Sequence, residues 1–250
     1  MAVHPTLLLI ADIAGYTRFM KLHTVSLAHA HDIVSRLLET IIDAAGPELK
    51  LAKLEGDAAF FYLPLAEDRA ADPAWIAARV SAIHGAFHRR AADLATNTLC
   101  PCDGCQQAGK LKLKLVGHLG DVAVRKVKRN TELAGIDVII VHRMLKNGVP
   151  VPEYLLMTEP FYRRVESQAG PFARPCALEF EDLGRAEAWY VDLTEVESVP
   201  ARPLGYGARL ARHLRLTWRS LPYFLGRKHA CEGFRNLEGE VVAVSATAPH

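Results

Sequence analysis

The stretch LAKLEGDAAFFYLP, residues 51–64, places three charged side chains among residues that otherwise favour a protein interior. Two apolar segments of strand length, residues 49–54 and 58–63, flank the turn-forming letters EGD. We therefore predict a β-hairpin with Asp57 at its turn and Lys53 in its first strand. A charge in an apolar interior costs several kcal/mol unless it is paired or binds a metal ion. The hairpin is therefore a candidate functional site as well as a fold element.

The composition is that of one large domain, or one domain with an appendage: the chain has 250 residues, 50% hydrophobic and 23% charged. The net charge of +2 does not favour nucleic acid, and we expect no nucleic-acid partner. The longest apolar runs, residues 6–11 and 58–63, are much shorter than the roughly 20 residues that span a bilayer. The N-terminal letters MAVHP do not have the pattern of a signal peptide, so we expect a cytoplasmic location.

Hydrophobic periodicity predicts alternating strands and helices. Residues 6–11 are typical of a central strand that ends at Asp12, and the helical pattern of residues 25–45 ends at Gly46-Pro47. Beyond the hairpin we predict helices at residues 73–96, 136–145 and 160–165, strands at 111–116, 121–127, 154–157, 178–183 and 188–191, and a basic loop between 127 and 136. This order predicts an α/β fold, an α+β sandwich with mixed strand directions.

Asp12 and Asp57 end two strands that we expect to be neighbours in the sheet. Two converging carboxylates are costly unless a divalent cation neutralises them, and oxygen ligands suit Mg²⁺ or Mn²⁺. The loop after Asp12, which contains Gly15, Tyr16 and Thr17, leads into a helix whose N-terminus favours a phosphate. This arrangement predicts phosphoryl-transfer chemistry. The alternative is that Asp12 caps the helix and Asp57 makes the turn, which are common roles for Asp.

Four segments resemble the class III nucleotidyl cyclases, the adenylyl and guanylyl cyclase catalytic domains. LLIADIAGYT resembles the family's FADISGFT, and KLEGDAAFF resembles its K-x-x-GDA hairpin. LVGHLGDV and GIDVIIVHRM resemble its R-x-GIH-x-GEV strands and its G-x-x-VN-x-A-x-RM helix. The segments occur in the family's order over about residues 7–193, and they are most similar to a subgroup with a Cys-x-Cys-x-x-Cys insertion. The resemblance implies a ferredoxin-like βααββαβ core with extra C-terminal strands.

The resemblance also implies a role for each matching residue. Asp12 and Asp57 are implied as the carboxylates of a two-metal site, and Lys53 as the residue that reads adenine, with Glu132 as its acidic partner. Arg143 is implied to stabilise charge on the transferring phosphate. The positions implied to bind phosphates are Lys128, Arg129 and Arg185. The activity implied is that of an adenylyl cyclase, a phosphorus–oxygen lyase that converts ATP to 3′,5′-cyclic AMP and pyrophosphate.

One position departs from the family pattern. The family's Asn, which orients the ribose, falls on Ile139, whose side chain cannot form a hydrogen bond. Losing one such bond in a transition state costs about 10²–10³ in rate. Two further hypotheses therefore stand beside a working cyclase: a pseudo-cyclase that senses nucleotide or mediates dimerisation, and a scaffold that binds nothing. The family's site lies between two catalytic domains, so a chain with one such domain is expected to form a homodimer.

Three of the five cysteines, Cys100, Cys102 and Cys105, lie within six residues. Thiolates favour a structural Zn²⁺ ion, which requires a fourth ligand. The candidates for it are Cys231, which we favour, His229, His88 and His118. The alternative is a set of reduced thiols or a redox switch. His84 and His88, one helical turn apart, are interpreted as a solvated helix face rather than a metal pair.

The sequence changes character near residue 199. We predict that residues 1–198 form the cyclase-like domain, with the Cys-rich insertion at about residues 98–108, and that residues 199–250 form a linker and a basic amphipathic tail. Arginines are interleaved with Leu and Trp between residues 209 and 228, a pattern compatible with contact to an anionic membrane surface or to nucleic acid. We favour a helix that packs its Leu/Trp face on the domain and leaves its arginines in solvent.

Overall fold

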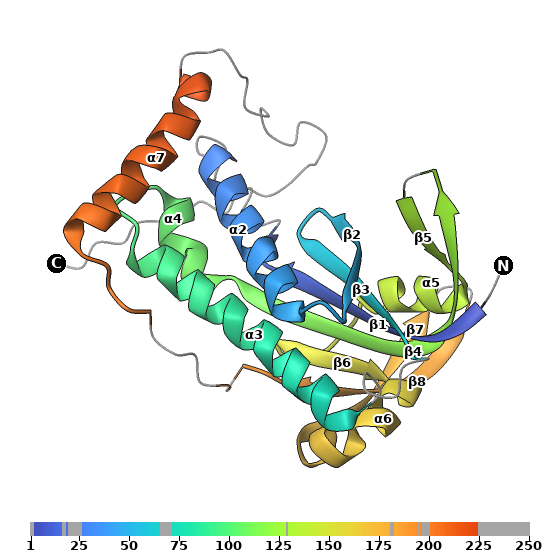
Figure 1. Ribbon diagram of the computed structural model, residues 1–250. Helices are drawn as coiled ribbons and strands as arrows, with labels where there is room; N and C mark the ends of the chain where they lie inside the picture. The colour runs from blue at the N-terminus through green and yellow to red at the C-terminus, as the bar shows by residue number, and fades with distance from the viewer. Residues whose placement is uncertain are drawn as a thin grey trace, which may run out of the picture.

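The computed structural model describes residues 3–16, 19, 27–65, 72–128, 130–180, 183–194, 196 and 201–224. Its strands and helices alternate along the chain (Figure 1). The strands are β1 (Val3–Ala14), β2 (Lys50–Glu55), β3 (Ala58–Pro64), β4 (Lys112–Val127), β5 (Asn130–Ala134), β6 (Tyr154–Thr158), β7 (Ala173–Phe180) and β8 (Gly184–Asp192). The α-helices are α2 (Leu27–Ala45), α3 (Pro73–Thr96), α4 (Asp103–Gln107), α5 (Ile136–Arg143), α6 (Glu159–Ala169) and α7 (Tyr206–Phe224).

The described strands form one sheet in the order β2-β3-β1-β4-β6-β8-β7, with β5 paired to the distal half of β4. β1 is an interior strand and is antiparallel to both β3 and β4. β4 and β6 are parallel, because the chain crosses over between them through β5 and α5. The predicted α/β fold with mixed strand directions is therefore confirmed, and so is the β2–β3 hairpin.

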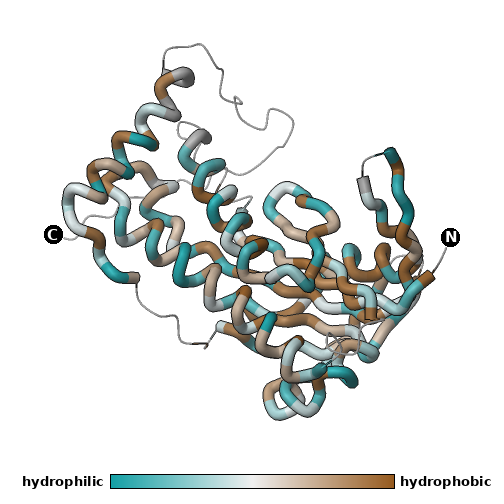
Figure 2. The backbone as a smooth tube through the Cα atoms, viewed as in Figure 1, coloured by the Kyte–Doolittle hydropathy of each residue, from teal (hydrophilic) through white to brown (hydrophobic). Residues whose placement is uncertain are grey.

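Two hydrophobic clusters cover the two faces of the sheet. Leu7, Leu9 and Ile13 of β1 belong to one cluster, under α2, α3 and α6, while Leu8 and Ile10 belong to the other, on the side of α5. Alternate residues of a strand point to opposite faces, so β1 contributes to both cores. Figure 2 shows the result as brown, apolar strands between helices of mixed colour. The face that carries α5 has only this one short described helix over it, which leaves room for a site.

β4 corrects two predictions. We expected two short strands, one on each side of residues 117–120, and a basic loop between residues 127 and 136. Instead, β4 runs unbroken from Lys112 to Val127, and part of the expected loop forms β5. Gly117 and Gly120 do not break the strand; they make room for side chains that pack on it. A Cβ atom at Gly117 would lie 2.7 Å from the Phe161 ring, and one at Gly120 would lie 2.2 Å from Cγ of Asp137.

α7 confirms the predicted helix in the tail but corrects its orientation. Arg212 donates to Asp93 of α3 at 2.9 Å, and Arg209 donates to the carbonyl of Thr98 at 3.2 Å. Leu214 and Trp218 are 59% and 76% exposed, so the cationic side chains anchor this helix and much of its apolar face meets solvent. None of the helices in the described ranges, α7 included, is long and apolar enough to cross a bilayer.

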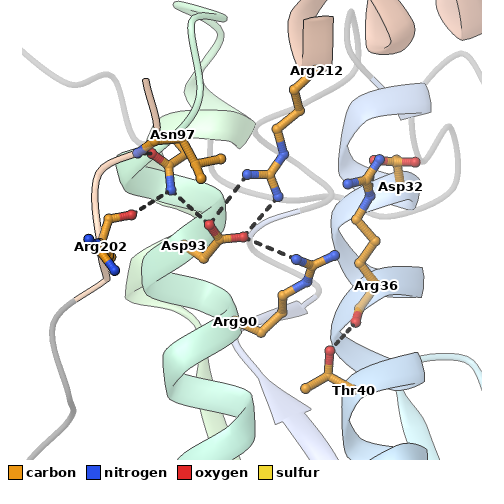
Figure 3. Close-up of polar contacts among 9 residues, drawn as sticks. Asp32, Arg36, Thr40, Arg90, Asp93, Asn97, Arg202 and Arg212 are labelled. Carbon is orange, nitrogen blue, oxygen red and sulfur yellow. Dashed lines mark hydrogen bonds and ion pairs between the residues drawn. The ribbon is translucent and has the colours of Figure 1, made fainter. Parts of the chain in front are cut away.

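Asn97, which is fully buried, joins the segment before α7 to α3 (Figure 3). Its side-chain NH₂ donates to Asp93 at 2.7 Å and to the carbonyl of Arg202 at 3.2 Å, and its Oδ1 accepts from the backbone N–H of Leu204 at 2.8 Å. This one side chain satisfies backbone groups of a segment more than a hundred residues away in the sequence.

We expect Asn97→Ala to lower the free energy of unfolding by about 2 kcal/mol, because it leaves buried polar groups without partners. Urea unfolding measures the change. Gln168→Ala, which removes an exposed amide on α6, is the matched control and should change it by less than about 0.5 kcal/mol. Equal effects of the two substitutions would contradict the role of Asn97.

Candidate functional site

The two predicted metal carboxylates lie at the same end of the sheet. Asp12 of β1 pairs with Ala58, the first residue of β3, and Ile13 N–H donates to the carbonyl of Asp57 at 3.2 Å. Gly56 has a φ of +66°, a conformation that favours glycine and makes the tight turn that carries Asp57. Asp12 follows the alternation of Leu8 and Ile10, which places it on the α5 face of the sheet.

Burial and mutual repulsion dominate the electrostatics of this pair. Burial, followed by repulsion from Asp12, raises the pKa of Asp57 to about 6, although its own backbone N–H opposes the shift. Burial also raises the pKa of Asp12 above its usual value, and the positive charge of Lys114 partly offsets it. Both carboxyl groups are therefore harder to ionise than in water, and a bound divalent cation would reverse this.

Lys114 is a residue of this site that sequence analysis missed. Leu and Lys alternate in residues 111–116, a pattern typical of a half-exposed strand. β4 instead lies inside the sheet, where Lys114 is opposite Asp12 in the register and its Nζ lies 5.8 Å from the centre of the Tyr154 ring. The alternation placed Lys114 on one face of its strand, but the carboxylate it acts on, Asp12, lies on β1 and is brought to it only by strand pairing.

A cavity of about 480 Å³ opens between the β2–β3 hairpin, α5 and β7. Its size falls in the range of roughly 300–1,000 Å³ that is usual for small-molecule sites. Lys53, Ile139 and Arg143 all line it, together with His142 and Lys146. The structure thus brings together the predicted base-reading lysine, the predicted catalytic arginine and the position where the resemblance implies Asn.

Lys53 is paired within this cavity. Its Nζ lies 2.5 Å from Glu55, whose other carboxylate oxygen lies 3.0 Å from Nε2 of His142. Partial burial opposes ionisation of Glu55, but the hydrogen bonds and positive charges of Lys53 and His142 lower its pKa below the usual value. Nδ1 of His142 lies 2.7 Å from the carbonyl of Val138, which fixes the ring. Glu55 and His142 extend the predicted site and were not among its predicted residues.

The other predicted nucleotide-binding residues are spread around this region. Gly15 follows β1 with a φ of +86°, and Tyr16 packs partly buried against the core under α2. Lys128 makes the turn between β4 and β5 with a φ of +56°, and Glu132 on β5 is opposite Arg125. Arg185 is an exposed residue near the start of β8. Thr17 and Arg129 lie outside the described residues.

His118 belongs to a buried network that sets the position of α5. Its Nδ1 lies 2.8 Å from the Thr158 hydroxyl, and its Nε2 lies 2.8 Å from Asp137. Asp137 also accepts from the backbone N–H of Asp121 at 2.9 Å, which ties the first turn of α5 to β4. His118 was a candidate zinc ligand, and that candidate is wrong because both of its nitrogens have other partners here.

The cysteine cluster gathers around a residue that sequence analysis did not consider. Cys100, Cys102 and Cys105 form one group with His29 of α2, and their ligand atoms all lie within 4.8 Å of one another. A hydrogen bond from Cys105, aided by His29 and opposed by burial, lowers the pKa of Cys102 to about 3. Cys231 and His229 lie outside the described residues. The signal that was available is only that His29 falls in a predicted helix.

His84 and His88 also differ from their prediction. They do not form a solvated helix face: His84 is 3% exposed, and His88 Nε2 lies 2.6 Å from the buried Glu153. Burial would raise the pKa of Glu153, but the nearby His84 ring at 3.7 Å and hydrogen bonds with His88, Leu113 N–H and Lys112 lower it far below the usual value. Lys112, whose Nζ lies 2.9 Å from Glu153, compensates the negative charge of that carboxylate. His88 therefore has Glu153 as its partner and is not a ligand of the cysteine cluster.

Comparison with known proteins gives a relative in sequence and relatives in fold. Residues 34–154 match a family described as a protein of unknown function (DUF2652). The uncharacterized protein Rv2561/Rv2562 of Mycobacterium tuberculosis (strain ATCC 25618 / H37Rv) is 42% identical over 205 residues, which cover 82% of this chain and 94% of that protein.

Two solved structures illustrate the likeness in fold. The catalytic core of a rhodopsin-guanylyl cyclase with converted specificity, in complex with ATPαS, is 15% identical; the match covers 76% of this chain and 97% of that one, with a TM-score of 0.55. The adenylyl cyclase CyaB from P. aeruginosa is 14% identical; the match covers 82% and 98%, with a TM-score of 0.52. The chain therefore belongs to the family of the M. tuberculosis protein Rv2561/Rv2562, and its fold is the class III cyclase fold that the sequence motifs predicted.

Proposed function

We propose that this protein binds a nucleoside triphosphate and divalent metal ions between two copies of the chain and converts ATP slowly to 3′,5′-cyclic AMP and pyrophosphate. The observation that carries the proposal is the pair Asp12 and Asp57, two partly buried carboxylates at one end of a cyclase-type sheet with raised pKa values. The cavity with Lys53 and Arg143 lies on the same face of the sheet.

The carboxylate pair fits Mg²⁺ or Mn²⁺. Oxygen ligands of this kind are preferred by both ions, and a cation offsets the burial and mutual repulsion that raise the two pKa values. When bound, the metals supply Lewis-acid stabilisation of the phosphate oxygens and favour loss of the proton from the ribose 3′-hydroxyl. In this proposal Asp12 and Asp57 hold the ions, and Lys114 limits the negative charge that remains around them.

The polar groups in the cavity suit a purine base and its phosphates. Lys53 offers a donor directly beside the acceptor oxygens of Glu55, and a purine edge presents an acceptor and a donor side by side. Arg143 lines the same cavity, where its guanidinium can stabilise charge that develops during phosphoryl transfer. Glu132, Lys128 and Arg185 remain predicted contacts of the base and phosphates.

A homodimer is supported by apolar side chains exposed around this site. Leu54 of β2 is 51% exposed, and Ile136 and Ile139 of α5 are 56% and 50% exposed. The β2–β3 hairpin and the β4–β5 hairpin project on the same side of the sheet, with α5 near their base (Figure 1). Exposed apolar residues that gather on one face favour association, and a second copy would bring its own Arg143 toward Asp12 and Asp57.

The test is product formation with complementing variants. Pure protein is incubated with ATP or GTP and Mn²⁺, and products are resolved by mass spectrometry. Asp57→Ala and Arg143→Ala should each be inactive alone. An equal mixture should recover about a quarter of the wild-type rate, because half of the dimers are mixed and each has one intact site. If the wild-type protein forms no cyclic product from either nucleotide at any concentration, it is not a cyclase. If the wild-type protein is active but the mixture of the two variants is not, the site is not shared between two chains.

The second candidate is a pseudo-cyclase, favoured by Ile139. It would bind nucleotide and metal without turnover, as a sensor or a dimerisation module. Its signature is a rise in melting temperature with ATP and Mn²⁺ that Asp57→Ala abolishes, while no cyclic product forms. A protein that is not stabilised by any nucleotide or metal would instead be a scaffold.

A further inference from the structure

The loop between α3 and β4 brings three thiols to one imidazole. Nδ1 of His29 lies 3.5 Å from Sγ of Cys100, 3.5 Å from Sγ of Cys102 and 3.8 Å from Sγ of Cys105. His29 lies in the first turn of α2, some seventy residues earlier in the chain. Four soft or borderline ligand atoms thus surround one point, contributed by two separate segments.

These distances are those of a tetrahedral zinc site. Zn–S bonds of about 2.3 Å and Zn–N bonds of about 2.0–2.1 Å, at a tetrahedral angle, place each sulfur about 3.6 Å from the nitrogen. All four ligand atoms also lie within 4.8 Å of one another, as four atoms bound to one ion must. Hydrogen bonds from a neutral imidazole do not explain the arrangement, because one nitrogen cannot form good hydrogen bonds with three sulfur atoms at once.

Hydrogen bonds between side chains and backbone hold the loop in this shape. Cys100 N–H donates to the Thr98 hydroxyl at 3.1 Å, and the Gln106 side chain donates to the carbonyl of Cys100 at 3.3 Å. Cys102 precedes the short helix α4, which carries Cys105 back toward Cys100. Cys100 and Cys105 are 7% and 4% exposed, so the site is closed to solvent on most sides, as in structural zinc sites.

The surroundings also suit the charge of such a site. One Zn²⁺ ion with three thiolates and a neutral imidazole has a net charge of −1. Cys105 and Arg212 of α7 line the same small pocket, and Arg209 donates to the carbonyl of Thr98 next to the loop. The cationic side of α7, which faces the protein, therefore lies beside the cysteine loop.

We propose that Cys100, Cys102, Cys105 and His29 bind one structural Zn²⁺ ion that joins the cysteine loop to α2 and supports the docking of α7. His29 takes the place for which the sequence suggested Cys231, so the ligand set is complete without the C-terminal residues. The proposal is independent of the nucleotide site, and its test does not use activity.

The test is the zinc content of the full-length protein, purified without added zinc and dialysed against metal-free buffer. We expect about one Zn²⁺ per chain by mass spectrometry of the metal, and less than about half an equivalent in Cys105→Ser and His29→Ala. Cys176→Ser is the matched control, because Cys176 is a free thiol on β7 outside the cluster, and it should keep the full equivalent. His29→Cys should also keep the metal, since four thiolates form a zinc site.

Cobalt substitution checks the ligand set. Wild-type protein loaded with Co²⁺ should absorb in the visible as a tetrahedral thiolate site, and His29→Cys should shift that spectrum toward four sulfur ligands. Wild-type zinc below about half an equivalent, or a disulfide between two of the three cysteines in the freshly purified metal-free protein, would overturn the proposal in favour of a redox site. Loss of zinc in Cys176→Ser, or full zinc with an unchanged cobalt spectrum in His29→Ala, would overturn the assigned ligands.

Discussion

Replacing Ile139 by Asn should raise the rate of cyclic nucleotide formation about 10²-fold. Ile139 lies on α5, is half exposed and lines the cavity that also contains Lys53 and Arg143. An amide at this position would supply a hydrogen bond to the ribose that isoleucine cannot form, and one such bond in a transition state is worth about 10²–10³ in rate. The measurement is the initial rate with ATP and Mn²⁺ at saturating nucleotide, so that kcat rather than binding is compared.

The matched control is Ile136→Asn, one turn earlier on the same helix. Ile136 is 56% exposed and is not among the residues that line the cavity, so its replacement makes an equal change in surface polarity. Its rate should not rise. If Ile139→Asn leaves kcat unchanged while nucleotide still stabilises the variant, then Ile139 is not what limits turnover. If both variants raise the rate equally, the effect comes from association of the chains rather than from the ribose contact.

Asp57→Asn should raise the free energy of unfolding of the metal-free protein. The same substitution should abolish most cyclic nucleotide formation when metal is present. The pKa of Asp57 is raised to about 6 by burial and by repulsion from Asp12, so its ionised form costs folding free energy at neutral pH. After allowance for solvent screening at this half-buried position, we expect a gain of about 1 kcal/mol at pH 8. Cyclic nucleotide formation should fall at least about 100-fold, because the site loses one of its two metal carboxylates.

The sign of the pH dependence distinguishes this account from a simple surface effect. A raised carboxyl pKa gives wild-type stability that is fully present below the unfolded value near 4 and is lost as the pH rises through about 6. The advantage of Asp57→Asn, measured by urea unfolding without metal, should therefore stay constant from about pH 8 to pH 6 and shrink between about pH 6 and pH 4. Asp43→Asn, at an exposed position on α2, is the control and should show no such trend.

Added Mn²⁺ gives the second readout for the same pair of variants. It should raise the melting temperature of wild-type protein and of Asp43→Asn but leave Asp57→Asn unchanged. Apparent Mn²⁺ affinity of the wild type should fall about tenfold between pH 7 and pH 5, because Asp57 must lose its proton to bind. Mn²⁺ stabilisation that persists in Asp57→Asn would place the metal elsewhere.

Local sequence patterns predicted the β2–β3 hairpin, the pairing of Lys53 with Glu55, and the positions of Asp12 and Asp57 at strand ends. The hairpin of β2 and β3 follows from two apolar runs around a Gly-containing turn, and alternation put Lys53 and Glu55 on one strand face, where they pair. The two aspartates fall where apolar strands end, so their convergence followed once those strands were expected to be neighbours. Such features depend on residues close in sequence, whose geometry the backbone period sets.

The parts that the sequence did not determine depend on distant segments. His29 meets the cysteines because α2 packs beside the loop between α3 and β4. Glu153, just before β6, meets His84 and His88 of α3, and Arg212 of α7 meets Asp93 of α3. For a histidine in a helix or a glutamate in a loop, no pattern of neighbouring residues predicts which distant residue it will contact. The sequence determined which strands carry the carboxylates and which residues stand at the cyclase motif positions. Tertiary packing alone brought His29 to the three cysteines and decided the inward face of α7, where charge pairing with α3 outweighed the apolar stripe along that helix.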